Sequence, residues 1–320
     1  MAVRNDKPMR YERVTKFVED HPWALVPSTL EAMLEVLALR TEGLMLSDEE
    51  IQARVGSREP PAARRTGVVA VLPLHGLIAH RMNLMTEVSG GMSTELVGKA
   101  ITLAVNDPDA SAIALDVDSP GGSVFGVPEL ADTIFQARGP KPIVAVANAT
   151  AGSAAYWIAS QADELIVTPS GQVGSIGVIG VHRDLSKQAA MLGVQHTFIT
   201  AGKHKGDGNE FEPLDDDTRA HMQRRVDQYY DLFVQAVARG RGVSAKAVRE
   251  GFGEGRIVSA GDALRGGMVD AVATLDQVVD LLGSGRKRVA PALAAGIPQL
   301  GMTAADEIAD LRLRLAERGA

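Results

Sequence analysis

The stretch PIVAVANATAGSAAYWIAS, residues 142–160, decides the fold. It opens with an apolar, valine-rich run typical of a buried strand and continues into a short helix of small and aromatic residues. Ser153 stands where the predicted strand passes into the predicted helix. A serine in that position presents its hydroxyl at the edge of a sheet beside the N–H groups of a helix N-terminus, as in a nucleophile elbow without its usual consensus. The alternative is that Ser153 only caps the helix.

Short apolar segments alternate with helical segments on both sides of this stretch. Strands are predicted at 68–76, 112–118, 142–148, 164–168 and 196–200. Helices are predicted at 94–107, 127–137, 153–160, 184–192 and 215–239. Apolar strands separated by helices are typical of a mostly parallel sheet that is covered on both faces. We therefore expect an α/β domain over residues 67–283.

The two ends of the chain have different patterns. Residues 1–60 are predicted to form an N-terminal helical extension, with a helix opened by SDEE at 47–50. An apolar face at helical spacing supports this prediction: Leu30, Met33, Leu34 and Leu37. His21-Pro22-Trp23 interrupts the helical pattern, and we interpret it as an anchor between helices. The run at 56–66 is predicted to be a linker, and residues 284–320 a linker followed by a short C-terminal helix.

Composition limits the classes of function. The chain has 320 residues, of which 45% are apolar and 23% charged, as in an ordinary soluble globular protein. It contains no cysteine, which excludes disulfides, zinc–thiolate sites and cysteine nucleophiles. A net charge of −7 gives no electrostatic support to general nucleic-acid binding. With no secretory signal and no long apolar run, a soluble cytoplasmic protein without a membrane segment is expected.

Two further motifs follow predicted strands. DSPGGSV at 118–124 has adjacent glycines that let backbone N–H groups point at a nearby group, although an ordinary strand-to-helix turn is the alternative. It matches neither of the glycine-rich phosphate-binding patterns. AGKHKGDGNEFEPL at 201–214 places Lys203 and Lys205 on a glycine-rich loop. A lysine on a loop is usually solvated, and a lysine acts as a base only when burial depresses its pKa.

The order of these motifs resembles the SppA-type (signal peptide peptidase A) serine peptidases. SPGG after a strand, AGSAAYWIAS, VGSIGVIG at 173–180, AGKHK, and GRIVSAGDALRGGMVD at 255–270 follow one another as in that family. The resemblance covers roughly residues 67–283. It implies a ClpP/crotonase-like fold and peptide hydrolysis by a Ser–Lys dyad, which needs no metal or organic cofactor.

The resemblance also implies roles for individual residues. Ser153 corresponds to the nucleophile and Lys205 to the general base. Ser175, in VGSIGV, corresponds to the serine that holds the lysine in place. The backbone N–H groups of Gly122 and Ala154 correspond to the oxyanion hole. The family further implies a ring-like homo-oligomer in which each active site draws on more than one subunit.

The N-terminal block at 21–56 is similar to the leader of phage-encoded homologues. These are capsid assembly, or prohead maturation, proteases of the lambda protease C type, which degrade scaffold and trim capsid or portal proteins. The expected substrates are therefore scaffold, capsid or portal proteins, and the expected location is the host cytoplasm or the prohead. The stretch after residue 283 is short, so a full fused scaffold is not expected. A cellular SppA-like peptidase that clears signal peptides or other peptides is the alternative.

Three other interpretations stay open. A Ser–His–Asp peptidase would use His182 and the nearby Asp184 with Ser153. A crotonase-type acyl-CoA enzyme would use the same oxyanion positions but would leave Ser153 and Lys205 without a task. A non-enzymatic assembly protein would keep the fold as an oligomerisation platform, against which the intact Ser/Lys pair argues. The basic run GRKR at 285–288 is predicted to be a solvated linker, with nucleic-acid contact as the alternative.

Overall fold

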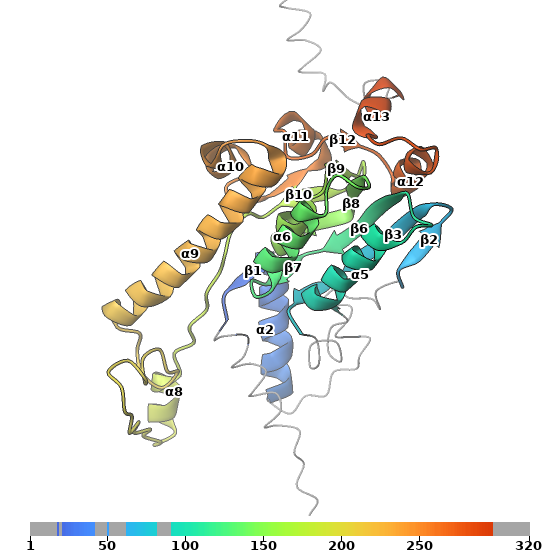
Figure 1. The fold of residues 1–320 in the computed structure, drawn as a ribbon. Helices are drawn as coiled ribbons and strands as arrows, with labels where there is room; N and C mark the ends of the chain where they lie inside the picture. Colours follow the sequence, from blue (N-terminus) through green and yellow to red (C-terminus); the bar gives the residue numbers. More distant parts are fainter. Residues whose placement is uncertain (1–17, 19–20, 42–49, 51–61, 82–90, 297–320) are drawn as a thin grey trace, which may run out of the picture.

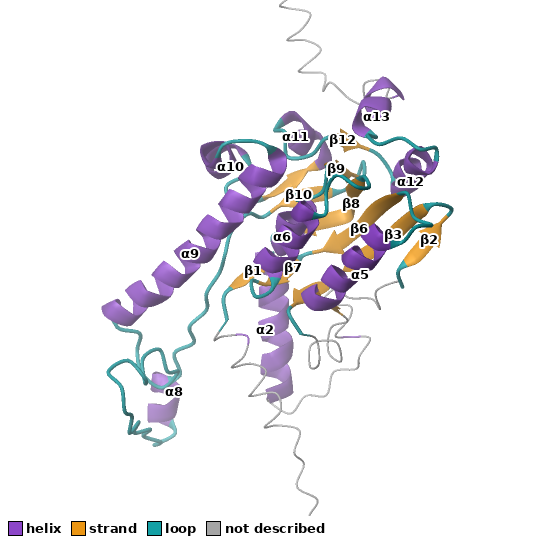
Figure 2. Cartoon of the chain, viewed as in Figure 1, coloured by secondary structure: helices purple, strands orange, loops and turns teal. Residues whose placement is uncertain are grey.

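Two β-sheets and the helices packed on them make up the described part of the chain (Figures 1 and 2). The computed structural model describes residues 18, 21–41, 50, 62–81 and 91–296. The helix predicted from SDEE and the C-terminal apolar stripe therefore lie outside the described residues, apart from Glu50.

The larger sheet confirms the predicted, mostly parallel arrangement. Its strands are β2 (Arg64–Thr66), β3 (Val69–His75), β6 (Ala112–Ser119), β8 (Ile143–Gly152), β9 (Glu164–Val167), β10 (Gln172–Gly174), β11 (Ile257–Ser259) and β12 (Ala271–Val272). β3, β6 and β8 run parallel at the centre, and both β9 and β10 pair in parallel with β8. β2 and β11 pair antiparallel at the two edges. The central strands are apolar and largely buried, because helices cover both of their faces.

Helices cover the sheet on both sides, as predicted. One face packs against α5 (Thr94–Asn106), α6 (Val127–Gln136), α7 (Ala154–Ala159), α9 (Asp216–Arg241), α10 (Ala245–Gly251) and α11 (Ala260–Arg265). The opposite face packs against α12 (Leu275–Gly283) and α13 (Ala290–Gly296). Trp157 stacks on Phe233 with ring centroids 4.6 Å apart, which joins α7 to α9. The short helix α7 is thus wholly enclosed between the sheet and α9.

A smaller sheet includes a strand from the N-terminal block, at the place where His21-Pro22-Trp23 interrupts the predicted helical pattern. Its order is β1 (Trp23–Leu25), β7 (Gly121–Ser123), β4 (Leu77–Ala79) and β5 (Gly91–Ser93). The helix predicted around Leu30–Leu37 is confirmed as α2 (Pro27–Thr41). Trp23 lies in a strand, but its side chain packs with α2 and its indole N–H donates to the carbonyl of helical Val18, which agrees with its interpretation as an anchor between helices. Pro22 and Pro27 bracket that strand, and three residues are too few to show a period of two.

Two other expectations about secondary structure are wrong. The linker predicted at 56–66 ends in β2, which pairs with β3. The strand predicted at 196–200 is an exposed loop, although its β-branched and aromatic residues favour a strand, because no described strand lies beside it to form a ladder. It belongs to residues 182–214, here named the arm, which contains α8 (Ser186–Met191) and lies beyond one end of α9, away from the sheets (Figure 1). The arm exposes several apolar side chains: Met191, Leu192, Val194, Phe198 and Ile199.

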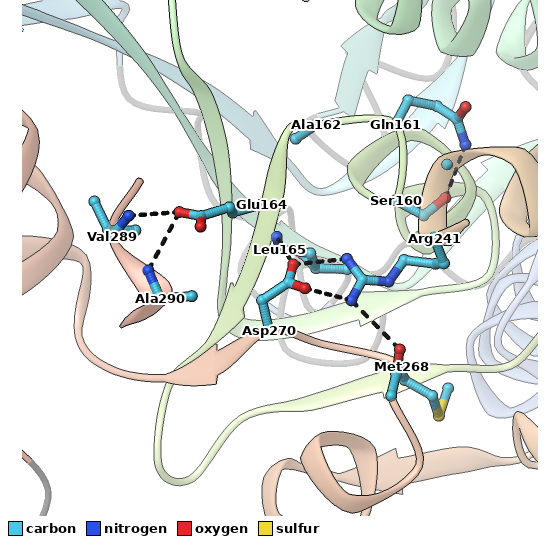
Figure 3. Close-up of polar contacts among 12 residues, drawn as sticks. Ser160, Gln161, Ala162, Glu164, Leu165, Arg241, Met268, Asp270, Val289 and Ala290 are labelled. Carbon is cyan, nitrogen blue, oxygen red and sulfur yellow. Dashed lines mark hydrogen bonds and ion pairs between the residues drawn. The ribbon is translucent and has the colours of Figure 1, made fainter. Parts of the chain in front are cut away.

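A largely buried ion pair joins the end of α9 to the sheet (Figure 3). Arg241 donates hydrogen bonds to the two carboxylate oxygens of Asp270 at 2.7 and 2.8 Å. The Leu165 N–H donates to the same carboxylate at 2.7 Å. Burial opposes the charge of Arg241, but the hydrogen bonds and charge of Asp270 outweigh it and raise the pKa of Arg241. The pair therefore stabilises the fold only while both partners are present.

Asp270→Ala is expected to lower the free energy of unfolding by about 3–5 kcal/mol, because it leaves a buried guanidinium without its carboxylate. Urea denaturation measures the change. Glu250→Ala is the control, because Glu250 pairs with Lys246 at 3.9 Å on the exposed surface of α10. That change should cost no more than about 1 kcal/mol. Equal losses in the two variants would contradict a special role for the Arg241–Asp270 pair.

A second buried carboxylate holds the segment before α13 (Figure 3). Glu164, at the start of β9, is 1% exposed and accepts hydrogen bonds from the N–H groups of Val289 at 2.6 Å and Ala290 at 3.3 Å. Arg288 of the GRKR run donates to it at 3.1 Å, although its side chain is mostly exposed. This basic run thus ends in an ion pair that holds the chain against the sheet.

Candidate active site

β8 carries Ser153 to a point where the larger sheet divides. Residues 144–147 of β8 pair with β9, whereas residues 150–152 pair with β10. Ala149, between these two segments, has a φ of 144°, outside the usual range for a residue with a side chain. β8 changes partner there, so its last residues end beside β10. In sheets of this kind, sites lie at the carboxyl ends of the parallel strands.

Ser153 adopts a strained backbone conformation, with φ 54° and ψ −116°. Such a geometry costs on the order of 1–3 kcal/mol and persists only where the surroundings enforce it. The Ser153 N–H donates to the Gly174 carbonyl at 2.7 Å, and the residue is fully buried. Its side chain makes no capping bond to α7, so the capping role is wrong. The hydroxyl instead lies 3.5 Å from the Gly177 carbonyl oxygen.

Two backbone segments bring N–H groups close to this serine. Ala154 is the first residue of α7, so its N–H has no acceptor within the helix. Gly122 lies in β7, the strand formed by the predicted glycine-rich turn. A Cβ added to the neighbouring Gly121 would stand 3.0 Å from both Ala154 N and the Gly152 carbonyl oxygen. β7 therefore passes directly against the turn that holds Ser153.

Ser175 lies beside Ser153 at the end of the adjacent strand. Gly152 and Gly174 are register partners in the parallel pair β8–β10, and the two serines come directly after them. Ser175 is buried, has a φ of 53°, and donates its N–H to the Arg256 carbonyl at 2.7 Å. Neighbouring strands lie about 5 Å apart, so the two serines are within reach of one common group.

Lys205 does not join this cluster within one copy of the chain. It lies in the arm, exposed, in a turn closed by its N–H bonding to the Gly202 carbonyl at 3.1 Å. Its ammonium makes no hydrogen bond or ion pair with any residue that the structure describes. One copy thus brings together Ser153, Ser175, the start of α7 and the strand β7, and leaves the lysine elsewhere.

His182 and Asp184 also lie in the arm and do not form a triad with Ser153. The Nε2 atom of His182 is 3.2 Å from the carbonyl oxygen of Asn209. The carboxylate of Asp184 accepts a hydrogen bond from the Ser186 N–H at 2.9 Å. A cleft of about 910 Å³ in this region is lined by His182 and Lys205 but not by Ser153. The geometry of one copy gives no support to the Ser–His–Asp alternative.

The sequence did not predict that the N-terminal block reaches the site. The Val26 side chain lies so close to Gly152 that a Cβ there would stand 2.7 Å from Val26 Cγ2. Trp23 forms an isolated bridge with Ile179, just beyond Ser175. The signal in the sequence is the short apolar run between Pro22 and Pro27, which is compatible with an edge strand.

Neither a metal cluster nor a membrane-spanning helix is found in the described ranges. In those ranges, no three His, Asp or Glu side chains gather as a metal ion would require. No helix described by the structure combines the length and the apolar character needed to cross a bilayer. The longest of these, α9, carries charged residues along its length.

Comparison with known proteins agrees with the motifs and the fold. The model of peptidase family S49 matches residues 136–288, a range that holds Ser153, Ser175 and Lys205. The Clp protease model matches residues 71–192, which include β7 and the start of α7. Residues 136–288 are thus similar to peptidase family S49, that of the SppA-type serine peptidases, and the α/β fold is similar to that of the Clp proteases.

Several characterised relatives cover the same region. The head-tail preconnector protein GP5 of Enterobacteria phage P21 is 32% identical over 242 residues, which are 76% of this chain and 48% of the relative. The capsid assembly protease C of Escherichia phage lambda is 32% identical over 227 residues, 71% of this chain and 51% of the relative. Protease 4 of Salmonella typhi is 28% identical over 214 residues, 67% of this chain and 34% of the relative. The chain thus spans about half the length of the phage relatives.

Proposed function

We propose that the chain is a serine endopeptidase in which Ser153 is the nucleophile and Lys205 of a neighbouring copy is the general base. The observation that carries this proposal is the strained turn at Ser153. It buries the hydroxyl at a helix N-terminus, beside the glycine strand β7. Strain of this kind clusters at active sites, where the surrounding structure enforces it.

The proposed reaction follows the Ser–Lys variant of the catalytic triad. Ser153 Oγ attacks the scissile carbonyl carbon, and its proton passes to the neutral amine of Lys205. The oxygen that becomes negative is stabilised by the N–H groups of Gly122 and Ala154, each worth about 3–4 kcal/mol. The lysine then gives its proton to the leaving amine, and water hydrolyses the acyl-enzyme. Ser175 is proposed to accept a hydrogen bond from the lysine and hold it in line.

The exposure of the arm supports a site shared between copies. A lysine amine becomes a base when it is desolvated, but Lys205 is exposed in a single copy. The apolar side chains exposed on the arm, such as Phe198 and Ile199, form a surface that a second protein surface would cover. A neighbouring copy that docks on the arm would bury the lysine and could place it beside Ser153. A head-to-tail arrangement of this kind forms a ring when the rotation between neighbouring copies closes.

The substrates proposed for this enzyme are scaffold, capsid or portal proteins of a phage prohead. The relatives named as a capsid assembly protease and a head-tail preconnector protein support this choice. A closed ring would admit flexible segments and exclude folded shells, which suits removal of scaffold from an assembling capsid. Co-expression with a scaffold protein tests this part of the proposal, because only the active enzyme should degrade it.

Lys205→Ala is expected to remove nearly all peptide hydrolysis, whereas Lys203→Ala and His182→Ala should keep most of it. The two control residues lie in the same arm. Comparing the variants therefore distinguishes loss of the general base from a general disturbance of the arm's structure. Since only a neutral amine accepts a proton, kcat/KM of the wild type should rise as the pH increases above neutral. A flat profile from about pH 5 to 9 would count against a lysine base, as would loss of activity in His182→Ala with Lys205→Ala active.

A further inference from the structure

The strand β1 of the N-terminal block covers the free edge of β7. Figure 1 shows the two side by side, with β1 leading into α2. They run antiparallel, with Ala24 opposite Gly122. Backbone bonds extend the pairing beyond the strand, from Val124 N to the Pro22 carbonyl at 3.4 Å and from Val26 N to the Pro120 carbonyl at 2.9 Å. Residues 22–26 therefore occupy the whole length of this edge.

The same segment is held on its other side by the chain that leaves Ser175. Trp23 N donates to the Ile179 carbonyl at 2.9 Å, and Ile179 N donates to the Trp23 carbonyl at 2.8 Å. The segment thus lies between two backbone partners, β7 on one side and Ile179 on the other. Each partner is close in sequence to a residue of the proposed active site, Gly122 or Ser175.

The segment also comes close to the reacting groups themselves. A Cβ on Gly121 would clash with the Ala24 carbonyl oxygen while standing 3.0 Å from Ala154 N, the second proposed oxyanion donor. The Ala24 carbonyl oxygen and Ala154 N therefore both lie close to the same point beside Gly121. Gly121 and Gly152 have no side chains to obstruct this approach, and Val26 contacts Gly152 from the far side.

An extended peptide commonly binds a protein by adding a strand to an exposed sheet edge. A substrate whose carbonyl is to receive the N–H groups of Gly122 and Ala154 must run along β7, where residues 22–26 now lie. We infer that residues 22–26 form an occluding strand, an intramolecular segment that occupies the substrate position and must leave before a peptide substrate binds. This inference rests on the proposed peptidase function of the same site.

The buried apolar side chains that pack on the occluding strand come mainly from residues close to it in sequence. Trp23 and Leu25 are buried, and the Trp23 indole N–H donates to the Val18 carbonyl at 2.7 Å. They pack in a small cluster whose other buried members are Val18, Leu30, Met33, Leu37 and Leu77. Leu77 alone of these lies outside the N-terminal block. Release of β1 and α2 as a unit would keep most of this cluster together and would break its contacts with Leu77, Ile179 and Val181, along with the packing of Ala24 in the main core.

A reversible crosslink tests whether the strand must move. Trp23 and Ser123 are register partners between two hydrogen-bonded pairs, so their Cα atoms lie close enough for a disulfide. The chain has no cysteine, so Trp23→Cys/Ser123→Cys creates a single possible crosslink. Peptide hydrolysis by the oxidised variant is expected to fall at least about tenfold below that of the reduced variant and to return on reduction. Wild type is the control, and equal rates in the crosslinked and reduced forms would overturn the inference.

Weakening the anchor provides a second, independent measurement. Trp23→Ala in the full chain should raise kcat/KM for a short fluorogenic peptide several-fold, mainly through a lower KM, because the strand leaves more readily. Leu282→Ala is the matched control, since Leu282 is equally buried but lies in the core on the opposite face of the sheet. An unchanged or lower kcat/KM in folded Trp23→Ala would show that the strand does not compete with substrate.

A binding measurement separates this inference from the proposed chemistry. Ser153→Ala is combined with the cysteine pair, and a fluorescent peptide with the sequence HPWALVPS of residues 21–28 is the probe. The reduced protein should bind the peptide and the oxidised protein should not. If neither the wild type nor the cysteine variant hydrolyses peptides in either redox state, but binding still depends on the redox state, occlusion stands and the Ser–Lys chemistry is wrong. If Ser153-dependent hydrolysis and peptide binding are the same in both redox states, occlusion is wrong and the peptidase function stands.

Discussion

Ser153→Ala is expected to lower the rate of peptide hydrolysis by about 10⁴-fold or more, because it removes the atom that attacks the scissile carbonyl. The residue sits in an enforced, strained turn and its hydroxyl has no capping task, so alanine removes no structural bond of the helix. The only hydrogen bond of the Ser153 hydroxyl within the described residues is the 3.5 Å contact with the Gly177 carbonyl. The fold should therefore survive the change. Because only the hydroxyl is removed, any difference in rate between the variant and the wild type reports on that group.

Ser160→Ala provides the matched control for this experiment. Ser160 ends the same helix, is equally buried, and donates its hydroxyl to the Trp157 carbonyl at 2.9 Å. That variant should lose some stability but keep its turnover number. Single-turnover and steady-state rates on one fluorogenic peptide measure both variants. Retention of activity by folded Ser153→Ala, or an equal loss in both variants, would be incompatible with a nucleophilic Ser153.

Mixing inactive Ser153→Ala protein with inactive Lys205→Ala protein is expected to restore activity. If neighbouring copies supply the two residues, some sites in mixed assemblies combine an intact serine from one copy with an intact lysine from the next. Random mixing of equal amounts in a head-to-tail ring makes about one quarter of the sites complete. The measurement is peptide hydrolysis after dissociation and reassembly, with mixed assemblies identified by mass.

Each inactive variant carried through the same reassembly alone is the control and should stay inactive. Mixed assemblies without recovered activity would place both residues in one copy, which would require the arm to fold back onto Ser153. A chain that stays monomeric at micromolar concentration would contradict the shared site altogether. The experiment therefore tests the separation between Lys205 and Ser153 that the single chain shows.

The central sheet and its helices were predictable because their signals are local and strong. Buried parallel strands such as β6 and β8 begin with continuous apolar runs, and α9 has an aspartate N-cap, a glycine C-cap and a long helical period. Ser153 was identifiable because a serine flanked by glycine and alanine marks the junction of a strand and a helix. The strained φ of Ser153, by contrast, depends on tertiary contacts and could not be predicted from a sequence pattern.

The remaining elements depend on partners that lie far away in the sequence. β1 exists because β7 offers an edge roughly a hundred residues later, and its three residues have no readable period of their own. The loop at 196–200 has the composition of a strand, yet no described strand pairs with it. Ser153 and Lys205 were grouped by resemblance, whereas one copy of the chain separates them, and the proposed completion of the site by a second copy would leave no trace in the spacing of one sequence.

The contacts of the buried Glu164 limit how much of the sheet can fold while the ribosome is still making the chain. Its carboxylate is bonded by Val289 and Ala290, and β9 also pairs with Ala271, more than a hundred residues later. During synthesis, β9 emerges long before these partners exist. Contacts between such distant residues slow folding and leave sheet edges open in the nascent chain. The chain therefore completes its core, and with it the support behind α7, only after residue 290 has left the exit tunnel.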